Sequence, residues 1–535
     1  MLRRGAILVR AQQIASDGDL GPLLESADAL IDDQILRDRL RHMYEAGGWV
    51  LLESCIADLP ADLRWLFESG AVTIAQVATL HTGIGALTAG DIIRAIDDHA
   101  LEGVAGLDEA AIAAIADVLP TLRRTIPRIP LGRAVLLVDP LLTALRESRG
   151  TAWVSPSGSL RRGDDTVGDL EIIAAAADPG PAVEALIRLP DVARVLHRRE
   201  RSLVLLLDRV QVVVRFPDPD SAGTLLFRTT GAAAHVRRIA ALAAERQMDP
   251  FAPASQEEAI YERAGVPIVP VEIRDGDEEI AAAREGRLPA LVSSTDIRGD
   301  LHMHSTFSDG RDPVETMVAG CHALGYEYMA ITDHSQRSAA ARNLTLDSVK
   351  RQADEIADLR EKYPQMTILH GCEVDIMPDG RLDFPDHVLE RFDIVLASLH
   401  DGAGQPAEAL YGRYAEAMRH PLVSVITHPT NRMLPHRPGY PLDYDRLFEL
   451  AVETGTMLEV DGAPAHLDLN GALARRAAAA GATLVIDSDC HRVEMLGRQM
   501  QLGLTTARRG WIEPRHVLNT RPLEEVRAAI ARKRT

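Results

Sequence analysis

The chain has 535 residues, of which 46% are hydrophobic, and a formal net charge of −20, so it is long enough for three or four domains. It has no apolar run of the roughly 18 residues that a membrane span needs, and its charge does not favour non-specific binding to nucleic acid. The N-terminus has no signal-peptide cleavage site, and four scattered cysteines are typical of a reducing cytoplasm.

Four regions follow one another along the chain. Residues 1–125 are rich in Ala and Leu with helical periodicity. Residues 126–235 begin with a proline-containing linker and a helical stretch, and then carry the β-rich runs SLVLLLD and VQVVVRF. Residues 236–297 are helical and rich in turns. From 298 to 535, short apolar runs alternate with amphipathic helices, which predicts βα units with parallel strands. The fold class is therefore multidomain α/β.

Polar residues stand at the ends of the apolar runs in the last region. In the segment GDLHMHSTFSDG, His302 and His304 are two residues apart, so on a strand they project from the same face. The other strand ends add carboxylates and more imidazoles, and in a βα barrel these ends meet on the face that carries the active site. The candidate ligands are His302, His304, Asp309, His334, Glu373, His400, His428, Asp489 and His491.

Imidazole and carboxylate donors without a thiolate suit Mn, Zn or Fe rather than Ca or Mg. Nine ligands are too many for one ion and suit two or three ions with a bridging carboxylate, a cluster that activates water and clamps phosphoryl oxygens. The alternative chemistry is amide hydrolysis with a carboxylated lysine as the bridge. No lysine lies on an expected strand, because Lys350 and Lys362 lie in helical segments. Glu373 is the better bridge, which favours phosphoester hydrolysis. Cys490, between two ligands, is expected to point away and pack.

The motifs DLHMHSTFSDG, ITDHS, GCEVDI, ASLHDG, ITHPT and IDSDCH together resemble the polymerase and histidinol phosphatase (PHP) domain. The resemblance implies a distorted seven-stranded barrel with three metal ions. It places one ion on His302, His304, Glu373 and Asp489, a second on Glu373, His400 and His428, and a third on Asp309, His334 and His491.

The region before 298 resembles the bacterial family X DNA polymerases that carry a C-terminal PHP domain. This implies a helix-hairpin-helix region over 1–125, a nucleotidyltransferase-like palm over 126–235 and a small thumb over 236–297. In GSLRRGDDTVGDLEII, the resemblance places Gly158 and Ser159 against a triphosphate. It makes Asp169 and Glu171 the ligands of a Mg²⁺ ion.

The polymerase motifs depart from the family pattern in several places. Val213 stands where a third aspartate is expected, and valine can neither bind a metal nor accept a proton. Arg228 and Thr229 replace an aromatic pair, and Val236 replaces an asparagine after His235. The hairpin turns read Ala71-Val72-Thr73 and Gly106-Leu107-Asp108 instead of Gly-x-Gly, and no lysine for a Schiff-base lyase precedes residue 350.

These patterns predict a metal-dependent phosphoesterase, a DNA 3′-to-5′ exonuclease or end-processing enzyme, whose polymerase half is weak or inactive. Its expected partners are DNA 3′ ends or gapped DNA, with dNTP for any remaining polymerase activity. Arg432, just after ITHPT, is expected to contact a substrate phosphate. Three alternatives stay open: a functional repair polymerase, a histidinol-phosphate-type phosphatase and a non-catalytic DNA-end-binding protein.

Overall fold

The structure is a computed structural model that describes residues 59–125, 127–276, 278–338 and 342–534. It divides into two compact units: Met1–Ile126 with Arg194–Arg198, and Pro127–Ala193 with Arg199–Thr535. The expected thumb and barrel lie in the second unit, and so does the expected palm apart from Ile126 and Arg194–Arg198. The first 58 residues of the predicted helical region, with Cys55, lie outside the described residues.

The first unit contains two helical pairs. Its helices are α6 (Ala61–Glu68), α7 (Ile74–Ala78), a π-helical turn (Thr79–Gly83), α8 (Ala89–Asp97) and α9 (Glu109–Thr125). At the start of α7, Thr73 Oγ1 accepts a hydrogen bond from the backbone N–H of Gln76 at 3.3 Å, and at the start of α9, Asp108 Oδ1 accepts one from Ala111 at 2.8 Å. The last residue of each turn therefore caps the helix that follows it with its side chain.

The second unit begins with a mixed sheet that matches the expected palm. The helices and strands of this region are β1 (Ile129–Pro130), α10 (Leu131–Glu147), β2 (Thr151–Pro156), α11 (Gly158–Arg162), β3 (Thr166–Val167), β4 (Leu170–Ala176), α12 (Gly180–Ile187), β6 (Ser202–Leu207) and β7 (Val210–Arg215). Strands β1 and β3 pair with each other, apart from the mixed sheet. Strand β5 (Arg194–Arg199) belongs mostly to the first unit. The sheet order is β2-β4-β7-β6-β5; the β4–β7 pair is parallel, and the β2–β4 and β6–β7 pairs are antiparallel.

Short helices follow the palm and form a separate apolar core. They are α13 (Ala222–Thr230), α14 (Ala233–Glu245), α15 (Glu258–Ala264), a 3₁₀ turn (Val271–Ile273) and α16 (Glu278–Arg284). Phe227, Ile239 and Tyr261 are buried between them. This arrangement has the helical character expected for the thumb region.

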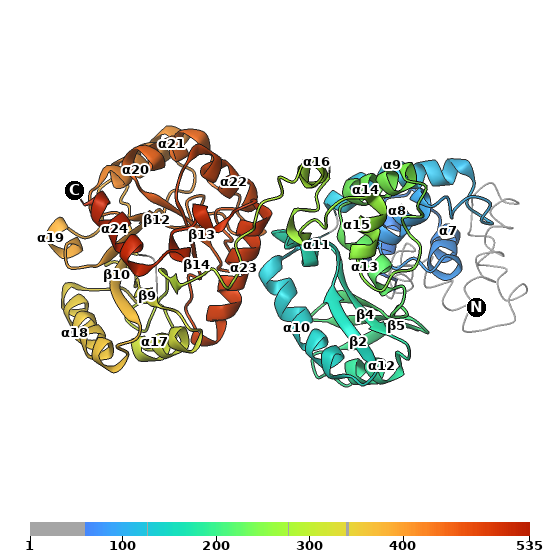
Figure 1. The fold of residues 1–535 in the computed structure, drawn as a ribbon, viewed down its shortest axis with the longest axis horizontal. Coiled ribbons are helices and arrows are strands. Elements are labelled where there is room, and N and C mark those ends of the chain that lie inside the picture. Colours follow the sequence, from blue (N-terminus) through green and yellow to red (C-terminus); the bar gives the residue numbers. More distant parts are fainter. Residues whose placement is uncertain (1–58, 126, 277, 339–341, 535) are drawn as a thin grey trace, which may run out of the picture. The chain divides into compact units, whose positions relative to one another are not determined.

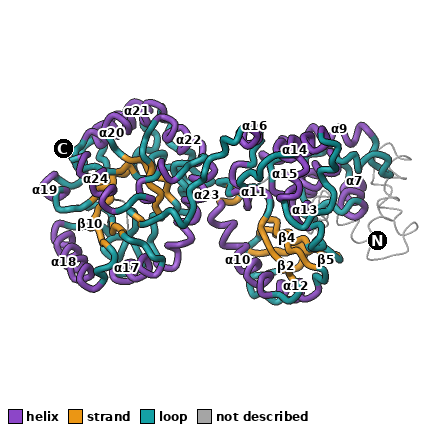
Figure 2. Tube along the Cα trace, in the orientation of Figure 1, coloured by secondary structure: helices purple, strands orange, loops and turns teal. Residues whose placement is uncertain are grey.

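The last region is a parallel barrel enclosed by helices (Figures 1 and 2). Its strands are β8 (Gly299–Asp300), β9 (Tyr328–Ile331), β10 (Thr367–Asp375), β11 (Ile394–Ser398), β12 (Val425–Ile426), β13 (Met457–Asp461) and β14 (Leu484–Asp487). The helices are α17 (Val314–Ala323), α18 (Leu346–Lys362), α19 (Asp386–Leu389), α20 (Ala407–Arg419), α21 (Tyr444–Thr454), α22 (Gly471–Ala480), α23 (Leu496–Arg509) and α24 (Leu523–Lys533), with 3₁₀ turns at Val493–Met495, Pro514–His516 and Leu518–Thr520.

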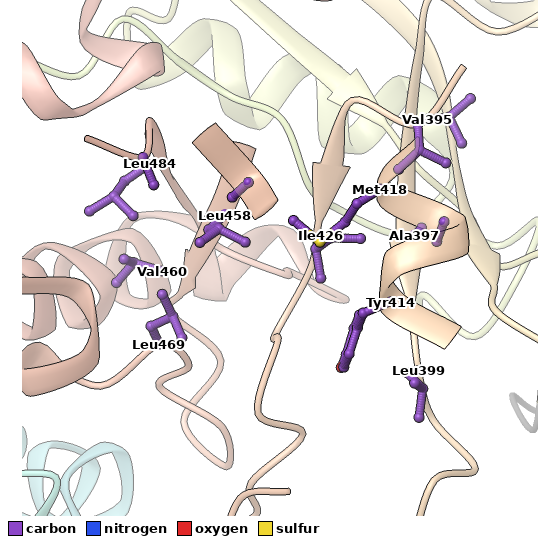
Figure 3. Close-up of a cluster of buried hydrophobic side chains, with 14 of the residues drawn as sticks. Val395, Ala397, Leu399, Tyr414, Met418, Ile426, Leu458, Val460, Leu469 and Leu484 are labelled. Carbon is purple, nitrogen blue, oxygen red and sulfur yellow. The ribbon is translucent and has the colours of Figure 1, made fainter. Parts of the chain in front are cut away.

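All seven strands pair in chain order, from β8 to β14. A parallel bridge joins Met303 to Cys490, so the two edges meet and nearly close the barrel. Alternate residues of each strand face outward and inward. Figure 3 shows the outward set, in which Tyr414 and Met418 of α20 lie beside Val395 and Ala397 of β11.

The inward set packs against the C-terminal helix. Leu396, Val425 and Val485 form one buried cluster with Val526 and Ile530 of α24. This helix fills the amino-terminal end of the barrel with apolar side chains, which leaves the carboxyl-terminal end for polar groups.

The predicted fold class is confirmed: a helical region, a palm-like mixed sheet, a small helical region and a distorted seven-stranded barrel follow one another. Within the described residues, none of the helices combines the length and the apolar character that a bilayer crossing requires.

Candidate metal centre and palm site

The structure brings all nine predicted ligand side chains together at the carboxyl-terminal end of the barrel. They fall into overlapping groups, of which three have donor atoms within 4.8 Å of one another: His304, Asp309, His334 and His491; His302, His304 and Asp489; and His334, Glu373 and His400. His428 joins these groups through Glu373, because His428 Nε2 donates a hydrogen bond to Glu373 Oε1 at 3.0 Å.

The most deeply buried donors surround a small space. His302 Nε2 and His304 Nε2 are 3.2 Å apart, and each lies 3.5 Å from Glu373 Oε2. Asp489 Oδ1 lies 3.1 Å from His304 Nε2 and 3.6 Å from His302 Nε2. A tetrahedral ion with ligand bonds of about 2.1 Å has ligand-to-ligand edges of about 3.4 Å. These four donors therefore have the spacing of a transition-metal site.

Glu373 connects this group to the others. Its Oε1 lies 3.3 Å from His400 Nε2, while its Oε2 lies 2.9 Å from His334 Nδ1. Neither Glu373 Oε2 nor His334 Nδ1 is satisfied by a hydrogen bond, although both are buried. A buried polar atom without a hydrogen bond is costly, and a metal ion would satisfy both atoms. The residues present therefore fit a metal cluster bridged by this carboxylate.

The remaining donors lie toward solvent. Asp309 Oδ1 is 3.2 Å from His491 Nε2 and 3.6 Å from His334 Nε2. The side chains of Asp309, His400 and His491 are 26%, 26% and 33% exposed, whereas His302 and His304 are fully buried. The cluster thus opens toward solvent on the side of these three residues.

Two of the ligand residues have unusual backbone conformations. His428 has φ of +29° and Asp489 has φ of +49°, in the left-handed region that non-glycine residues rarely adopt. The backbone N–H of His428 donates to Glu459 Oε2 at 2.6 Å, which helps to hold this conformation. Strained backbone of this kind often occurs at functional sites.

Sequence reasoning missed two carboxylates that orient the imidazoles. His302 Nδ1 donates to Glu459 Oε1 at 2.6 Å, and His400 Nδ1 donates to Asp375 Oδ1 at 2.7 Å. Each bond fixes the proton on Nδ1 and directs the lone pair of Nε2 toward the cluster. The signal was present in the sequence, since Asp375 stands two residues after Glu373, and Glu459 lies in the apolar run TMLEVDG.

We expect Glu459→Gln to weaken metal binding by about 10- to 100-fold, because a neutral amide orients the His302 imidazole less firmly. Titration of the apo-protein with Mn²⁺ would measure the change. Glu408→Gln, at an exposed ion pair with Arg446 on the outer helices, is the matched control and should bind as the wild type does. Equal affinities for the two variants would contradict the orienting role of Glu459.

The charges in the cluster favour cations. Burial alone would raise the pKa of Glu373, but the imidazoles of His334 and His400 outweigh it and hold this pKa well below its usual range. Against the effect of burial, the carboxylates of Glu373 and Asp375 raise the pKa of His400 to about 10. Burial and the nearby His491 lower the pKa of His304 to about 4. Metal ions would replace protons at imidazoles whose pKa is raised, such as that of His400. Metal affinity should therefore fall as the pH is lowered.

Two neighbours of the ligands have other roles. The Cys490 thiol donates to the carbonyl of Arg492 at 2.9 Å and packs in an apolar cluster, as its expected packing role requires. His466, which the sequence pattern left out of the cluster, stacks on His428 with ring centroids 5.5 Å apart. Its Nδ1 donates to the carbonyl of Arg432 at 2.8 Å.

Arg432 does not extend into the cluster. Its Nη1 donates to Asp165 Oδ2 at 2.6 Å, its Nε donates to the carbonyl of His466 at 2.8 Å, and its Nη2 donates to the carbonyl of Leu467. The residue is only 7% exposed. The protein itself therefore holds this guanidinium, and the geometry gives no support to the predicted phosphate contact.

The palm carboxylates meet an arginine. In the β4–β7 register, Val213 lies directly beside Glu171, at the place where the resemblance to family X polymerases implies an aspartate. Glu171 Oε1 accepts a hydrogen bond from Arg215 Nε, and its Oε2 accepts one from Ser157 Oγ at 2.7 Å. Asp169 is half-buried just before the strand. A guanidinium thus occupies one oxygen of a predicted magnesium ligand.

The expected nucleotide pocket is also built differently. Gly158, with φ of +62°, starts α11, and Ser159 follows it. Arg228 stacks on the ring of Phe251 at 4.3 Å. His235 is buried, with its Nδ1 donating to Glu279 at 2.6 Å and its Nε2 accepting from the Tyr261 hydroxyl at 2.8 Å. These side chains serve the packing of the thumb region.

Comparison with known proteins extends over both halves of the chain. Residues 300–461 match the PHP domain. The DNA polymerase/3′-5′ exonuclease PolX of Bacillus subtilis (strain 168) is 34% identical over 508 residues, which cover 92% of this chain and 89% of that protein. A probable phosphatase of Thermoanaerobacter sp. (strain X514) is 28% identical over 233 residues, covering 41% of this chain and 89% of the phosphatase.

A crystal structure of Leishmania infantum polymerase beta covers 40% of this chain and 99% of its own, with 16% identity and a TM-score of 0.26. The similarity to the Bacillus subtilis protein, in contrast, extends over nearly the whole chain. The chain therefore belongs to the family of PolX DNA polymerase/3′-5′ exonuclease proteins, and its C-terminal region is a PHP domain.

Proposed function

We propose that this protein is a metal-dependent phosphoesterase that removes nucleotides from DNA 3′ ends during repair. The observation that carries the proposal is the arrangement around Glu373, whose two oxygens face five imidazoles from four different segments of the barrel. Bound transition-metal ions, Mn or Zn for this donor set, would activate water and neutralise charge on phosphoryl oxygens.

The nine residues would hold about three ions. His302, His304, Glu373 and Asp489 would bind one, Glu373, His400 and His428 a second, and Asp309, His334 and His491 a third. The spacings support this division, because the imidazole donors of each set lie 3.0–3.6 Å from a carboxylate oxygen of the same set.

The chain itself contributes orientation and access. Glu459 and Asp375 keep protons on the Nδ1 atoms of His302 and His400, so the Nε2 atoms stay available. The buried donors exclude bulk water from the inner side of the cluster. A phosphodiester would approach from the exposed side, near Asp309 and His491.

The polymerase half would act mainly as a scaffold for DNA. Glu171 is bound by Arg215 and flanked by Val213, so the palm lacks the set of free carboxylates that two-metal nucleotidyl transfer uses. Asp169 and Glu171 would at most hold a weakly bound Mg²⁺, and Gly158 and Ser159 a weakly bound dNTP.

The function is tested with purified protein, Mn²⁺, and a single-stranded or gapped DNA labelled at its 5′ end. We expect stepwise shortening from the 3′ end with release of mononucleotides. Parallel reactions with histidinol phosphate and with dNTPs distinguish the phosphatase and polymerase alternatives. Hydrolysis of histidinol phosphate alone, or DNA binding without any hydrolysis, would contradict the proposal.

A further inference from the structure

The loop that carries His428 is anchored in the palm-like domain. Asp165 lies in the turn after α11, 267 residues before Arg432, and their side chains form an ion pair of 2.6 Å. Arg432 is nearly buried, and its other two donor groups bind backbone carbonyls of the barrel. A palm carboxylate thus neutralises a guanidinium that the barrel holds four residues after a metal ligand.

Short contacts connect Arg432 to His428 itself. The backbone N–H of Arg432 donates to Thr430 Oγ1 at 3.3 Å, and Thr430 is fixed by Asp468, which accepts from its N–H and its hydroxyl at 2.9 Å each. The Arg432 side chain donates to the carbonyl of His466, and the His466 side chain donates to the carbonyl of Arg432. The His466 ring in turn stacks on His428. Displacement of Arg432 would therefore move groups in direct contact with a metal ligand.

The two domains pack closely around this ion pair. A Cβ atom on Gly132 of α10 would lie 2.3 Å from Pro464 Cβ, and one on Gly163 would lie 2.0 Å from Thr505 Cγ2. Leu467 and Leu502 of the barrel belong to the apolar core of the palm. Such tight packing gives the ion pair a fixed geometry, unlike an exposed pair between mobile side chains.

From this geometry we infer that Asp165 is a positioning residue of the metal centre. It holds Arg432, and through it the loop of His428, in the conformation that binds metal. The palm-like domain, in which polymerase residues have been replaced, would then be a working part of the phosphoesterase site. The expected effect on catalysis rests on the proposed function, whereas the expected effects on loop conformation and metal affinity do not.

The test compares Asp165→Asn with Asp139→Asn. Asp139 of α10 forms another palm–barrel ion pair of the same length, 2.6 Å to Arg498 of α23, in which the two side chains are about one-third exposed. Both substitutions remove one charge and keep the side-chain shape. Asp165→Glu restores the charge and is the conservative variant.

Three measurements are made: hydrogen exchange of segment 428–437 in the apo-protein, Mn²⁺ affinity by titration, and kcat and KM on bis(p-nitrophenyl) phosphate. For Asp165→Asn we expect faster exchange, an affinity of the weakest Mn²⁺ reduced by about tenfold, and a kcat reduced by a similar factor with KM within about twofold. Asp139→Asn should stay within about twofold throughout, and Asp165→Glu should recover part of the loss.

The inference would be overturned if Asp165→Asn showed the same hydrogen exchange and Mn²⁺ affinity as the wild type. It would also be overturned if Asp139→Asn lost as much Mn²⁺ affinity and kcat as Asp165→Asn. If the wild type fails to hydrolyse any phosphodiester, the proposed function is wrong. Exchange and metal affinity still decide the positioning role in that case, because neither depends on turnover.

Discussion

Replacement of Glu373 by glutamine is expected to abolish phosphodiester hydrolysis, with a loss of at least about a thousandfold, equivalent to about 4 kcal/mol of transition-state stabilisation. The carboxylate lies within 3.5 Å of five imidazoles, and its Oε1 and Oε2 face different histidines. A neutral amide cannot bridge two cations, so binding of two ions should fail together. Metal content after reconstitution should fall from about three equivalents to about one.

Elemental analysis and the exonuclease assay, performed on the same preparations, measure this effect. Glu408→Gln is the control at an exposed glutamate. Glu373→Ala removes the carboxylate without adding an amide and should lose the same activity and metal content. Nuclease activity in Glu373→Gln equal to that of the control would refute the role of this carboxylate as a bridge.

The second large effect concerns primer extension, which we expect to be absent or very weak. Nucleotidyl transfer needs carboxylates that hold the catalytic metal and accept the primer proton. Val213 offers only an apolar surface beside Glu171, and Arg215 neutralises Glu171 itself. Loss of such a group should cost several kcal/mol, and each ~1.4 kcal/mol is a tenfold loss in rate.

Single-nucleotide insertion into gapped DNA with Mg²⁺ or Mn²⁺ tests this expectation in a His302→Ala background, so that exonuclease action cannot remove the product. Val213→Asp alone should restore little, because Arg215 still binds Glu171, and Arg228, Thr229 and Val236 still alter the nucleotide pocket. Insertion at a rate typical of repair polymerases would show that the palm has kept its function.

The sequence was most informative where one local rule decides the geometry. His302 and His304 are two residues apart, and their imidazole nitrogens do meet at 3.2 Å. Most of the other candidate ligands stand at or just after the ends of parallel strands, and the carboxyl ends of such strands must meet at one end of a barrel. For this reason the barrel and its nine clustered side chains could be predicted without coordinates.

Long-range contacts were beyond sequence reasoning. The ion pair between Arg215 and Glu171 depends on the register of β4 and β7, which the sequence does not state. The position of Arg432 just after a ligand motif predicts a phosphate contact, but a partner 267 residues away, Asp165, holds its side chain. The role of Glu459 depends on which nitrogen of His302 faces the cluster, and the sequence does not state this.

The most direct test of the account is the assay of DNA 3′-end hydrolysis by wild-type protein reconstituted with Mn²⁺, with metal content measured on the same sample. The account predicts about three metal equivalents and stepwise release of mononucleotides from the 3′ end, both lost when the metal is removed by chelation and both restored by Mn²⁺. Fewer than one bound equivalent after reconstitution, or hydrolysis of DNA that chelation leaves unchanged, would contradict it.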